Sequence, residues 1–196
     1  WEVNQILGKG WLAADRERVA LPASSALWSD TAAFEALIHS GSGSIASWKE
    51  AIDLYRGDFL EGFNVADTAP FEAWQTQQTA YFRREFANAL GNLVQALALE
   101  KEHDQALLYA RRWLALDPLN ETAQRVLMRL LAEIGDRSGA IRQYESCALI
   151  LKTELNIAPQ PETTQLYETI LHGEVHAAPI PRAAPVTNRQ PYPAPR

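Results

Sequence analysis

The residues of this sequence that could take part in chemistry are few, and its four histidines and single cysteine come first. His172 and His176 are four residues apart, a spacing at which two ligands share a helix face and can bind a metal. Gly173 stands between them and prolines follow, so we expect the helix to end first and no metal to bind. Cys147 lies on an apolar helical stripe, which predicts a buried core thiol rather than a nucleophile.

Four carboxylates surround two glycines in the segment 53–67. They are Asp53, Asp58, Glu61 and Asp67. Their spacing is not the alternating one of a calcium-binding loop, and nothing around them suggests a general acid, so we expect a solvated turn. Gly8-Lys9-Gly10 lacks the Lys-Ser/Thr order of a phosphate-binding loop. The sequence therefore predicts no catalytic residue, no cofactor and no metal, and hence no enzyme.

A group of aromatic residues indicates a different kind of function, the binding of another protein. The group consists of Tyr55, Phe59, Phe63, Phe71 and Trp74. We expect most of these rings to join the first helices to the rest of the core. The alternative is that some of them line a concave groove in which a helical repeat binds a peptide.

The elements that position these side chains belong to a chain of 196 residues, 47% of them hydrophobic, which is enough for a real core. The sequence has neither a membrane-spanning apolar run nor a signal peptide. One cysteine cannot form an internal disulfide, which fits a cytoplasmic protein. The chain begins with Trp1 rather than methionine, so we expect it to be a piece of a longer protein.

Charge is distributed unevenly along the chain. Residues 177–196 contain three arginines and no acid, so the segment 1–176 carries a net charge of −9. Phosphate groups are repelled by such an acidic body. We therefore expect no direct binding of DNA or RNA by this chain.

Composition divides the chain into residues 1–28, 29–176 and 177–196. In the first segment, residues 11–14 and 18–21 are typical of two short strands joined as a hairpin. Such a hairpin is barely stable alone, so it must pack on something, and a disordered end is the alternative. The last segment holds six of the eleven prolines, which predicts an extended, flexible linker.

The middle segment is predicted to be helical. We expect a helix over 31–39 capped by Asp30, a second one after Ser47, a long one over 71–99 and a last one over 162–171. Between the last two, three shorter apolar stripes predict three further helices. Asp117-Pro118 and the proline-rich stretch 158–161 separate these helices.

A repeat with a period of about 34 residues relates residues 90–120 to residues 123–155. The positions that carry this repeat are Leu93, Leu97, Ala106, Pro118, Leu127, Leu131, Ala140 and Tyr144. Small residues such as Ala106 and Ala140 allow paired helices to approach closely. The expected fold is all-α, with tetratricopeptide-like hairpins stacked as a short right-handed solenoid and a small N-terminal β-hairpin remnant. An irregular helical bundle is the alternative.

Several strings of this sequence together resemble the bacterial transcriptional activator domain. They are Ala51-Ile52-Asp53-Leu54-Tyr55-Arg56-Gly57-Asp58-Phe59-Leu60-Glu61-Gly62-Phe63, Phe71-Glu72-Ala73-Trp74, Ala106-Leu107-Leu108-Tyr109-Ala110-Arg111-Arg112, Leu116-Asp117-Pro118-Leu119-Asn120-Glu121, Gln143-Tyr144-Glu145 and Leu155-Asn156-Ile157-Ala158-Pro159-Gln160-Pro161-Glu162-Thr163. In activators of the antibiotic-regulatory type, this domain comes after an N-terminal winged-helix DNA-binding domain. Residues 11–21 look like the wing of such a domain, whose recognition helix is not in this chain.

The resemblance implies a non-enzymatic regulatory module that positions DNA-binding domains and contacts partner proteins. The partners would be another copy of the chain or the transcription machinery, with DNA bound only through the N-terminal domain of the parent. The alternative function is a free-standing peptide-binding scaffold unrelated to transcription. A helix-turn-helix upstream of Trp1 would distinguish the two.

Overall fold

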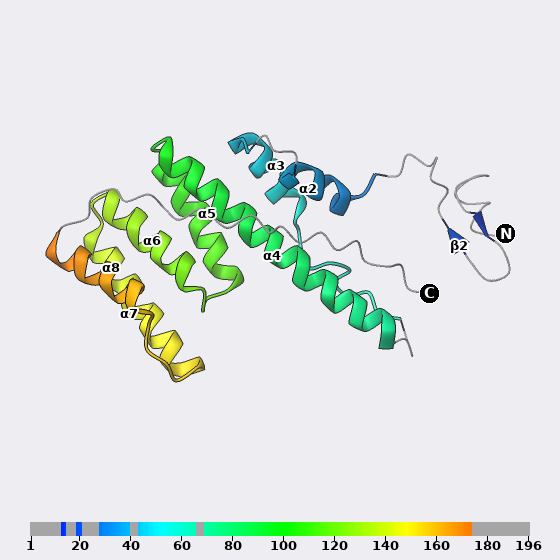
Figure 1. Cartoon of the computed structure of the whole chain (residues 1–196). Coiled ribbons are helices and arrows are strands. Elements are labelled where there is room, and N and C mark those ends of the chain that lie inside the picture. Colours follow the sequence, from blue (N-terminus) through cyan, green and yellow to red (C-terminus); the bar gives the residue numbers. More distant parts are fainter. Residues whose placement is uncertain (1–12, 15–18, 21–27, 40–42, 66–68, 174–196) are drawn as a thin grey trace.

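The computed structural model describes residues 13–14, 19–20, 28–39, 43–65 and 69–173, and seven α-helices lie in this part of the chain (Figure 1). Their bounds are α2 Asp30–His39, α3 Ile45–Leu54, α4 Ala69–Leu99, α5 His103–Leu116, α6 Glu121–Glu133, α7 Arg137–Glu154 and α8 Pro161–His172. Each helix packs against the next one along the chain, and α6 also contacts α8. The predicted all-α architecture is confirmed for the described helical body, while the right-handed solenoid stays a prediction.

Two residue pairs near the N-terminus form a minimal antiparallel ladder. Strand β1, Ala13–Ala14, pairs with β2, Val19–Ala20, with Ala13 opposite Ala20. This pairing falls where the sequence predicted a hairpin. Its origin as the wing of a DNA-binding domain stays a prediction, because the rest of residues 1–27 lies outside the described part of the chain.

The first two helices begin slightly earlier in the chain than predicted, and a serine caps each of them. Ser29 caps α2, because its Oγ accepts a hydrogen bond from the Ala32 amide at 3.2 Å; Asp30 is already the first helical residue. Ser44 caps α3, and the Ser47 amide donates to its Oγ at 3.1 Å. Serine suits this position because its hydroxyl satisfies an amide that has no partner within the helix.

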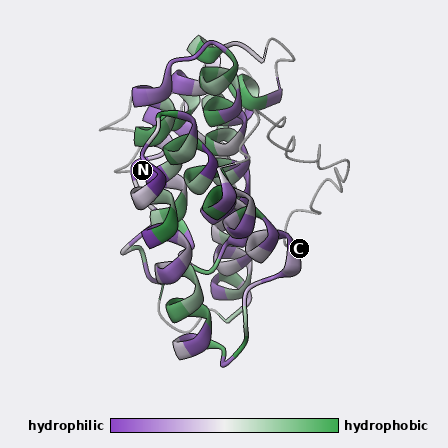
Figure 2. Cartoon of the chain, turned by 90° about the vertical axis from the view of Figure 1, so that its left-hand side faces the viewer, coloured by the Kyte–Doolittle hydropathy of each residue, from purple (hydrophilic) through white to green (hydrophobic). Residues whose placement is uncertain are grey.

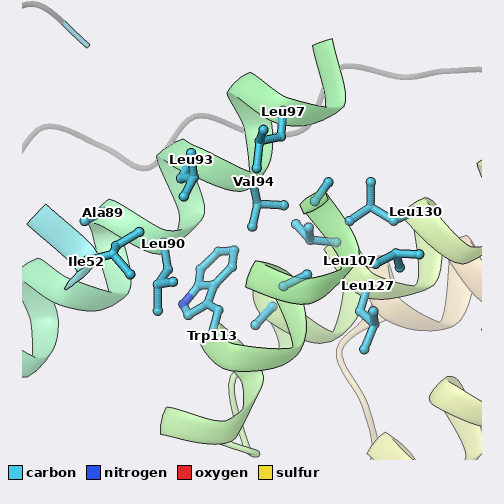
Figure 3. Packing of buried hydrophobic residues seen from close by; sticks show 14 of the residues in the cluster. Ile52, Ala89, Leu90, Leu93, Val94, Leu97, Leu107, Trp113, Leu127 and Leu130 are labelled. Carbon is cyan, nitrogen blue, oxygen red and sulfur yellow. The ribbon is translucent and has the colours of Figure 1, made fainter. Parts of the chain in front are cut away.

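The amphipathic pattern of the helices produces one continuous core. Figure 2 shows hydrophobic and hydrophilic residues alternating along the helices, as expected when one face of each helix is buried. Figure 3 shows Leu90 of α4 beside the ring of Trp113 from α5, with Leu93, Val94 and Leu97 further along the same helix. Gly91 makes this contact possible, since a Cβ on it would lie 3.1 Å from the Trp113 ring.

The sequence repeat appears in the structure as two equivalent helix–turn–helix units. Helix α4 ends at Leu99 and α6 at Glu133, whereas α5 begins at His103 and α7 at Arg137, so both pairs of boundaries are separated by one period of the repeat. Both turns close with the same pair of backbone hydrogen bonds. These are Lys101 N to Ala98 O and Glu102 N to Leu97 O in one turn, and Gly135 N to Ala132 O and Asp136 N to Leu131 O in the other. Such a paired closure, with a left-handed residue at its centre, is a common way to end a helix.

The eight predicted repeat positions differ in how far their side chains are buried. Six of them have almost no exposed surface: Leu93, Leu97, Ala106, Leu127, Leu131 and Ala140. Tyr144 is partly buried and stacks on Tyr167 of α8, with ring centroids 4.1 Å apart. Pro118 is exposed, because it lies in the turn between α5 and α6 and contributes no side chain to the core.

Replacing Ala140 with leucine is expected to lower the free energy of unfolding by about 1–3 kcal/mol, the usual cost of overpacking. Ala140 has no exposed surface, so three further carbon atoms cannot be accommodated without movement of the paired helices. Urea denaturation followed by circular dichroism measures this difference. Ala115→Leu at an exposed position of α5 is the control, and equal midpoints for the two variants would contradict the proposed helix contact.

Candidate protein-interaction surface

The loop between α3 and α4 packs its aromatic residues against the N-terminal half of α4. Phe63 contacts Phe71 at 5.9 Å between ring centroids, Phe71 contacts Trp74 at 5.5 Å, and Trp74 contacts Phe59 at 5.5 Å. Phe59 then stacks on Phe82 of α4 at 5.4 Å. The structure therefore brings four of the five predicted aromatics into one row of rings that leads from the surface into the core.

The fifth predicted aromatic, Tyr55, belongs to the core junction instead. Its ring stacks on Phe86, with centroids 4.1 Å apart and planes within 8° of parallel. The guanidinium carbon of Arg112 lies 5.1 Å from the centroid of the Phe86 ring. Arg112 Nη2 also donates to the carbonyl oxygens of Ile52 and Tyr55, each at 3.4 Å. This arrangement joins the end of α3 to α5 across α4.

Hydrogen bonds between polar side chains hold the loop on α4. We call the residues that make them, Tyr55, Asp58, Gln75 and Arg83, the polar latch. Asp58 accepts a hydrogen bond from Arg83 Nε at 2.7 Å, and the Tyr55 hydroxyl donates to the same carboxylate oxygen at 3.2 Å. Gln75 Nε2 donates to the carbonyl oxygens of Leu60 and Phe63, at 3.0 and 3.2 Å. The backbone of the loop is therefore tied to α4 at several points.

The latch also changes the acid–base behaviour of its members. The hydrogen bond from Arg83 lowers the pKa of the Asp58 carboxyl, because it stabilises the ionised form. Burial, together with the neighbouring carboxylate of Asp58, raises the pKa of Tyr55 to about 12. Asp58 lies in the predicted turn but is paired with Arg83, whereas Asp53 is exposed near the end of α3 and Glu61 is exposed in the turn; Asp67 lies outside the described residues.

The outer end of this loop and helix presents an apolar surface, which we call the aromatic tip. It consists of Leu60, Phe63, Val65, Phe71 and Trp74. Phe63 is 50% exposed, whereas Phe71 and Trp74 are partly buried. The carboxylates of Glu61 and Glu72 lie in the same segments and are exposed. Figure 1 shows this end of α4 projecting away from α5 to α8.

Sequence reasoning missed the residues of α4 that form the latch. Arg83 and Gln75 carry no signal of their own, because their partners are 25 and 12 to 15 residues away. The only hint in the sequence was the number of acidic turn residues just before a long helix. Pairing across such distances is decided by how the loop folds back.

A second polar contact fixes α8 on α6. The buried carboxylate of Glu121 accepts hydrogen bonds from the Thr163 hydroxyl at 2.6 Å and from the Gln160 amide at 2.8 Å. Arg125 Nη1 donates to Thr163 Oγ1 at 2.9 Å. Two of the strings that carried the family resemblance, those ending in Glu121 and in Thr163, therefore meet in space.

Among the remaining candidates for chemistry, His39 and His172 make hydrogen bonds within their own helices, whereas the buried Nδ1 of His103 has no hydrogen-bond partner among the described residues. Cys147 is buried as predicted, and burial raises the pKa of its thiol to about 11. His172 Nδ1 lies 2.7 Å from the carbonyl oxygen of Glu168 in its own helix, and His176 lies outside the described residues. Within the described residues, no three histidine, cysteine or acidic side chains gather into a possible metal site. None of the described helices has the length and apolar character that crossing a membrane requires.

Replacing Asp58 with asparagine is expected to cost less than about 1 kcal/mol at pH 7, because Arg83 is largely exposed and its pairing is screened by solvent. The pKa of Asp58 is lowered in the folded state, so its contribution is complete above the unfolded value of 3.8 and is lost as pH falls through the folded value. The difference in urea midpoint between wild type and variant should therefore shrink as the pH is lowered below about 4. Asp53→Asn is the control. If the difference in urea midpoint between wild type and Asp58→Asn grows on acidification, the pKa of Asp58 is not lowered in the folded state.

Comparison with known proteins identifies a family for most of the chain. The family profile described as the bacterial transcriptional activator domain matches residues 29–171. A glycylpeptide N-tetradecanoyltransferase from Emericella nidulans is 36% identical to this chain over 81 residues. That alignment includes 40% of this chain and 16% of the transferase, so the chain spans less than a fifth of the length of that protein.

Proposed function

We propose, because this chain belongs to the bacterial transcriptional activator domain family, that it is a regulatory module that positions DNA-binding domains and contacts partner proteins. The observation that carries this proposal is the family match over residues 29–171, which includes all seven described helices except the last residue of α8. The family is a regulatory one, of the transcriptional activator type. The short match to an acyltransferase supplies no activity for this chain, since it includes so little of that enzyme.

In this proposal, DNA is read by a winged-helix domain whose last strands lie within residues 1–28. The antiparallel pairing of β1 with β2 supports this reading of the N-terminal segment. The linker predicted over residues 177–196 lies outside the described part of the chain. The module would act in the cytoplasm, where bacterial transcription takes place.

The aromatic tip is the surface that we assign to the partner protein. Aromatic anchors that are already held in place lose little conformational freedom on binding, and such residues often dominate the affinity of an interface. The latch supplies this order, because Gln75 and Arg83 hold the loop in one conformation. The stacked helical units would then set the distance between the tip and the DNA-binding domain.

The experiment is a pull-down with the immobilised chain from a bacterial lysate that expresses a tagged second copy. We expect recovery of the second copy or of a component of the transcription machinery, and loss of that recovery in Phe63→Ser. Leu149→Ser, at an exposed apolar position of α7, is the control and should bind normally. A partner that binds equally to both variants would contradict the assigned surface.

The chain itself is expected to bind duplex DNA no more tightly than about micromolar at physiological salt, the range of non-specific binding. Its residues before 177 carry a net charge of −9, which repels the phosphate backbone. Fluorescence anisotropy with labelled promoter-length duplexes measures the affinity. Sequence-selective binding tighter than this limit would contradict the assignment of DNA reading to a separate domain.

A further inference from the structure

A cleft of about 360 Å³ opens between the N-terminal end of α2 and the loop after α3. The side chains that decide its chemistry are those of Asp30, Phe34, Tyr55, Arg56, Phe59 and Phe82. Its volume falls in the range of small-molecule sites, which runs from about 300 to 1,000 Å³. The cleft shares only Leu60 with the aromatic tip, and the rings of Phe63, Phe71 and Trp74 do not line it.

Four aromatic rings form the apolar part of this cleft, and they hold one another in place. Phe34 contacts Tyr55 at 6.2 Å and Phe82 at 6.3 Å, and Phe59 stacks on Phe82 at 5.4 Å. Gln75 Nε2 donates to the Leu60 carbonyl oxygen at 3.0 Å, which holds the loop wall on α4. The cleft is therefore formed before any ligand arrives, as is usual for small-molecule sites.

One carboxylate and one guanidinium at this cleft remain available for a ligand. Asp58 is already bound by Arg83 and Tyr55, so its charge is compensated. Asp30 accepts a hydrogen bond from the Thr31 amide through Oδ1 alone, at 2.8 Å. Among the described residues, Arg56 has no hydrogen bond or ion pair, and it does not pair with Asp30.

We infer that this cleft binds a small aromatic molecule that carries both an ammonium and a carboxylate group, the chemistry of an aromatic amino acid. The partly exposed rings of Tyr55 and Phe59, backed by the buried Phe34 and Phe82, contact the aromatic part, since ring–ring contacts favour an aromatic ligand over an aliphatic one. The Asp30 carboxylate binds the ammonium group, and the Arg56 guanidinium binds the carboxylate, for which its planar pair of donors is suited. The inference concerns a small-molecule site and does not depend on the proposed contact with a protein.

Isothermal titration calorimetry of the whole chain with three matched compounds tests this inference. L-Phenylalanine carries both charges, phenethylamine only the ammonium group and 3-phenylpropionate only the carboxylate. L-Phenylalanine is expected to bind at least about tenfold more tightly than either of the other two, because only it uses both charged groups. All three compounds should nevertheless show saturable binding, since each presents the same phenyl group to the aromatic rings of the cleft.

Two variants, each lacking one charge, separate the contributions of Arg56 and Asp30 to the binding affinity. Arg56→Gln should weaken L-phenylalanine and 3-phenylpropionate by about tenfold and leave phenethylamine unchanged, whereas Asp30→Asn should weaken L-phenylalanine and phenethylamine only. Both side chains are exposed, so neither change removes core packing. Arg111→Gln and Asp53→Asn, at exposed positions outside the cleft, are the matched controls.

The inference is overturned by any of three results. The first is no saturable binding of the three compounds up to about 10 mM, which corresponds to a negligible affinity. The second is equal affinity for L-phenylalanine and one of the singly charged compounds. The third is L-phenylalanine binding that is unchanged in both Arg56→Gln and Asp30→Asn. Recovery of a partner protein through Phe63 would be unaffected in each case, so the two proposals can fail separately.

Discussion

Replacing Phe86 with alanine is expected to lower the free energy of unfolding by about 3–5 kcal/mol, the range for loss of a buried aromatic side chain. Phe86 is 2% exposed and lies where three helices meet. Its ring stacks on Tyr55, and Arg112 of α5 covers it. Its removal leaves a cavity and ends the ring stacking between α4 and the end of α3, so the first two helices should loosen from the rest.

Urea denaturation followed by tryptophan fluorescence measures this loss, and near-ultraviolet circular dichroism reports the packing of the aromatic rings. Phe63→Ala is the matched control, because the same atoms are removed from a side chain that is 50% exposed. The control should change the midpoint little. Similar losses of unfolding free energy in Phe86→Ala and Phe63→Ala would show that the junction around Phe86 contributes no more to stability than the loop surface does.

Replacing Glu121 with alanine is expected to cost about 3 kcal/mol, because two donors lose a charged acceptor at once. The carboxylate is 7% exposed and accepts from the Thr163 hydroxyl and the Gln160 amide. Both donors belong to the start of α8, so this helix should separate from α6 before the remaining helices unfold. The exposed apolar surface that α8 normally covers would then favour aggregation.

Hydrogen exchange measured by mass spectrometry distinguishes local unfolding of α8 from global unfolding of the chain. Residues 161–172 should exchange faster in Glu121→Ala, whereas α4 and α5 should keep their protection. Glu145→Ala, at an exposed position of α7, is the control and should leave the exchange of α8 unchanged. Unchanged protection of α8 in the Glu121 variant would mean that apolar packing, such as that of the buried Ile170, holds this helix without the carboxylate.

The helical body was predictable because its signals are local. Leu93, Leu97 and Ala106 recur one period later as Leu127, Leu131 and Ala140, and apolar residues at helical spacing define one buried face on each helix. The start of α3 was predicted after Ser47, slightly too late, because serines at both ends of the first turn are good capping residues. Only the hydrogen bond from the Ser47 amide to Ser44 Oγ shows which one begins the helix.

The candidate sites were less predictable, since they depend on contacts between distant parts of the chain. The aromatic residues were recognised as a group, but the sequence did not distinguish Tyr55, which is part of the core, from Phe63, which is at the surface. The cleft beside α2 was not predicted at all. Asp30 and Arg56 line the same cleft only because α3 turns back between them.

The sequence by itself determined the helices, the repeat and the family of this chain, because each of these depends on residues close together or on a repeated spacing. The tertiary structure alone decided which carboxylates are engaged, as with Asp58 on Arg83 and Glu121 on Thr163. It also decided which aromatic rings remain at the surface. The physical reason is that a side chain's partner and its exposure depend on how the helices pack, and packing is a property of the whole chain rather than of any segment.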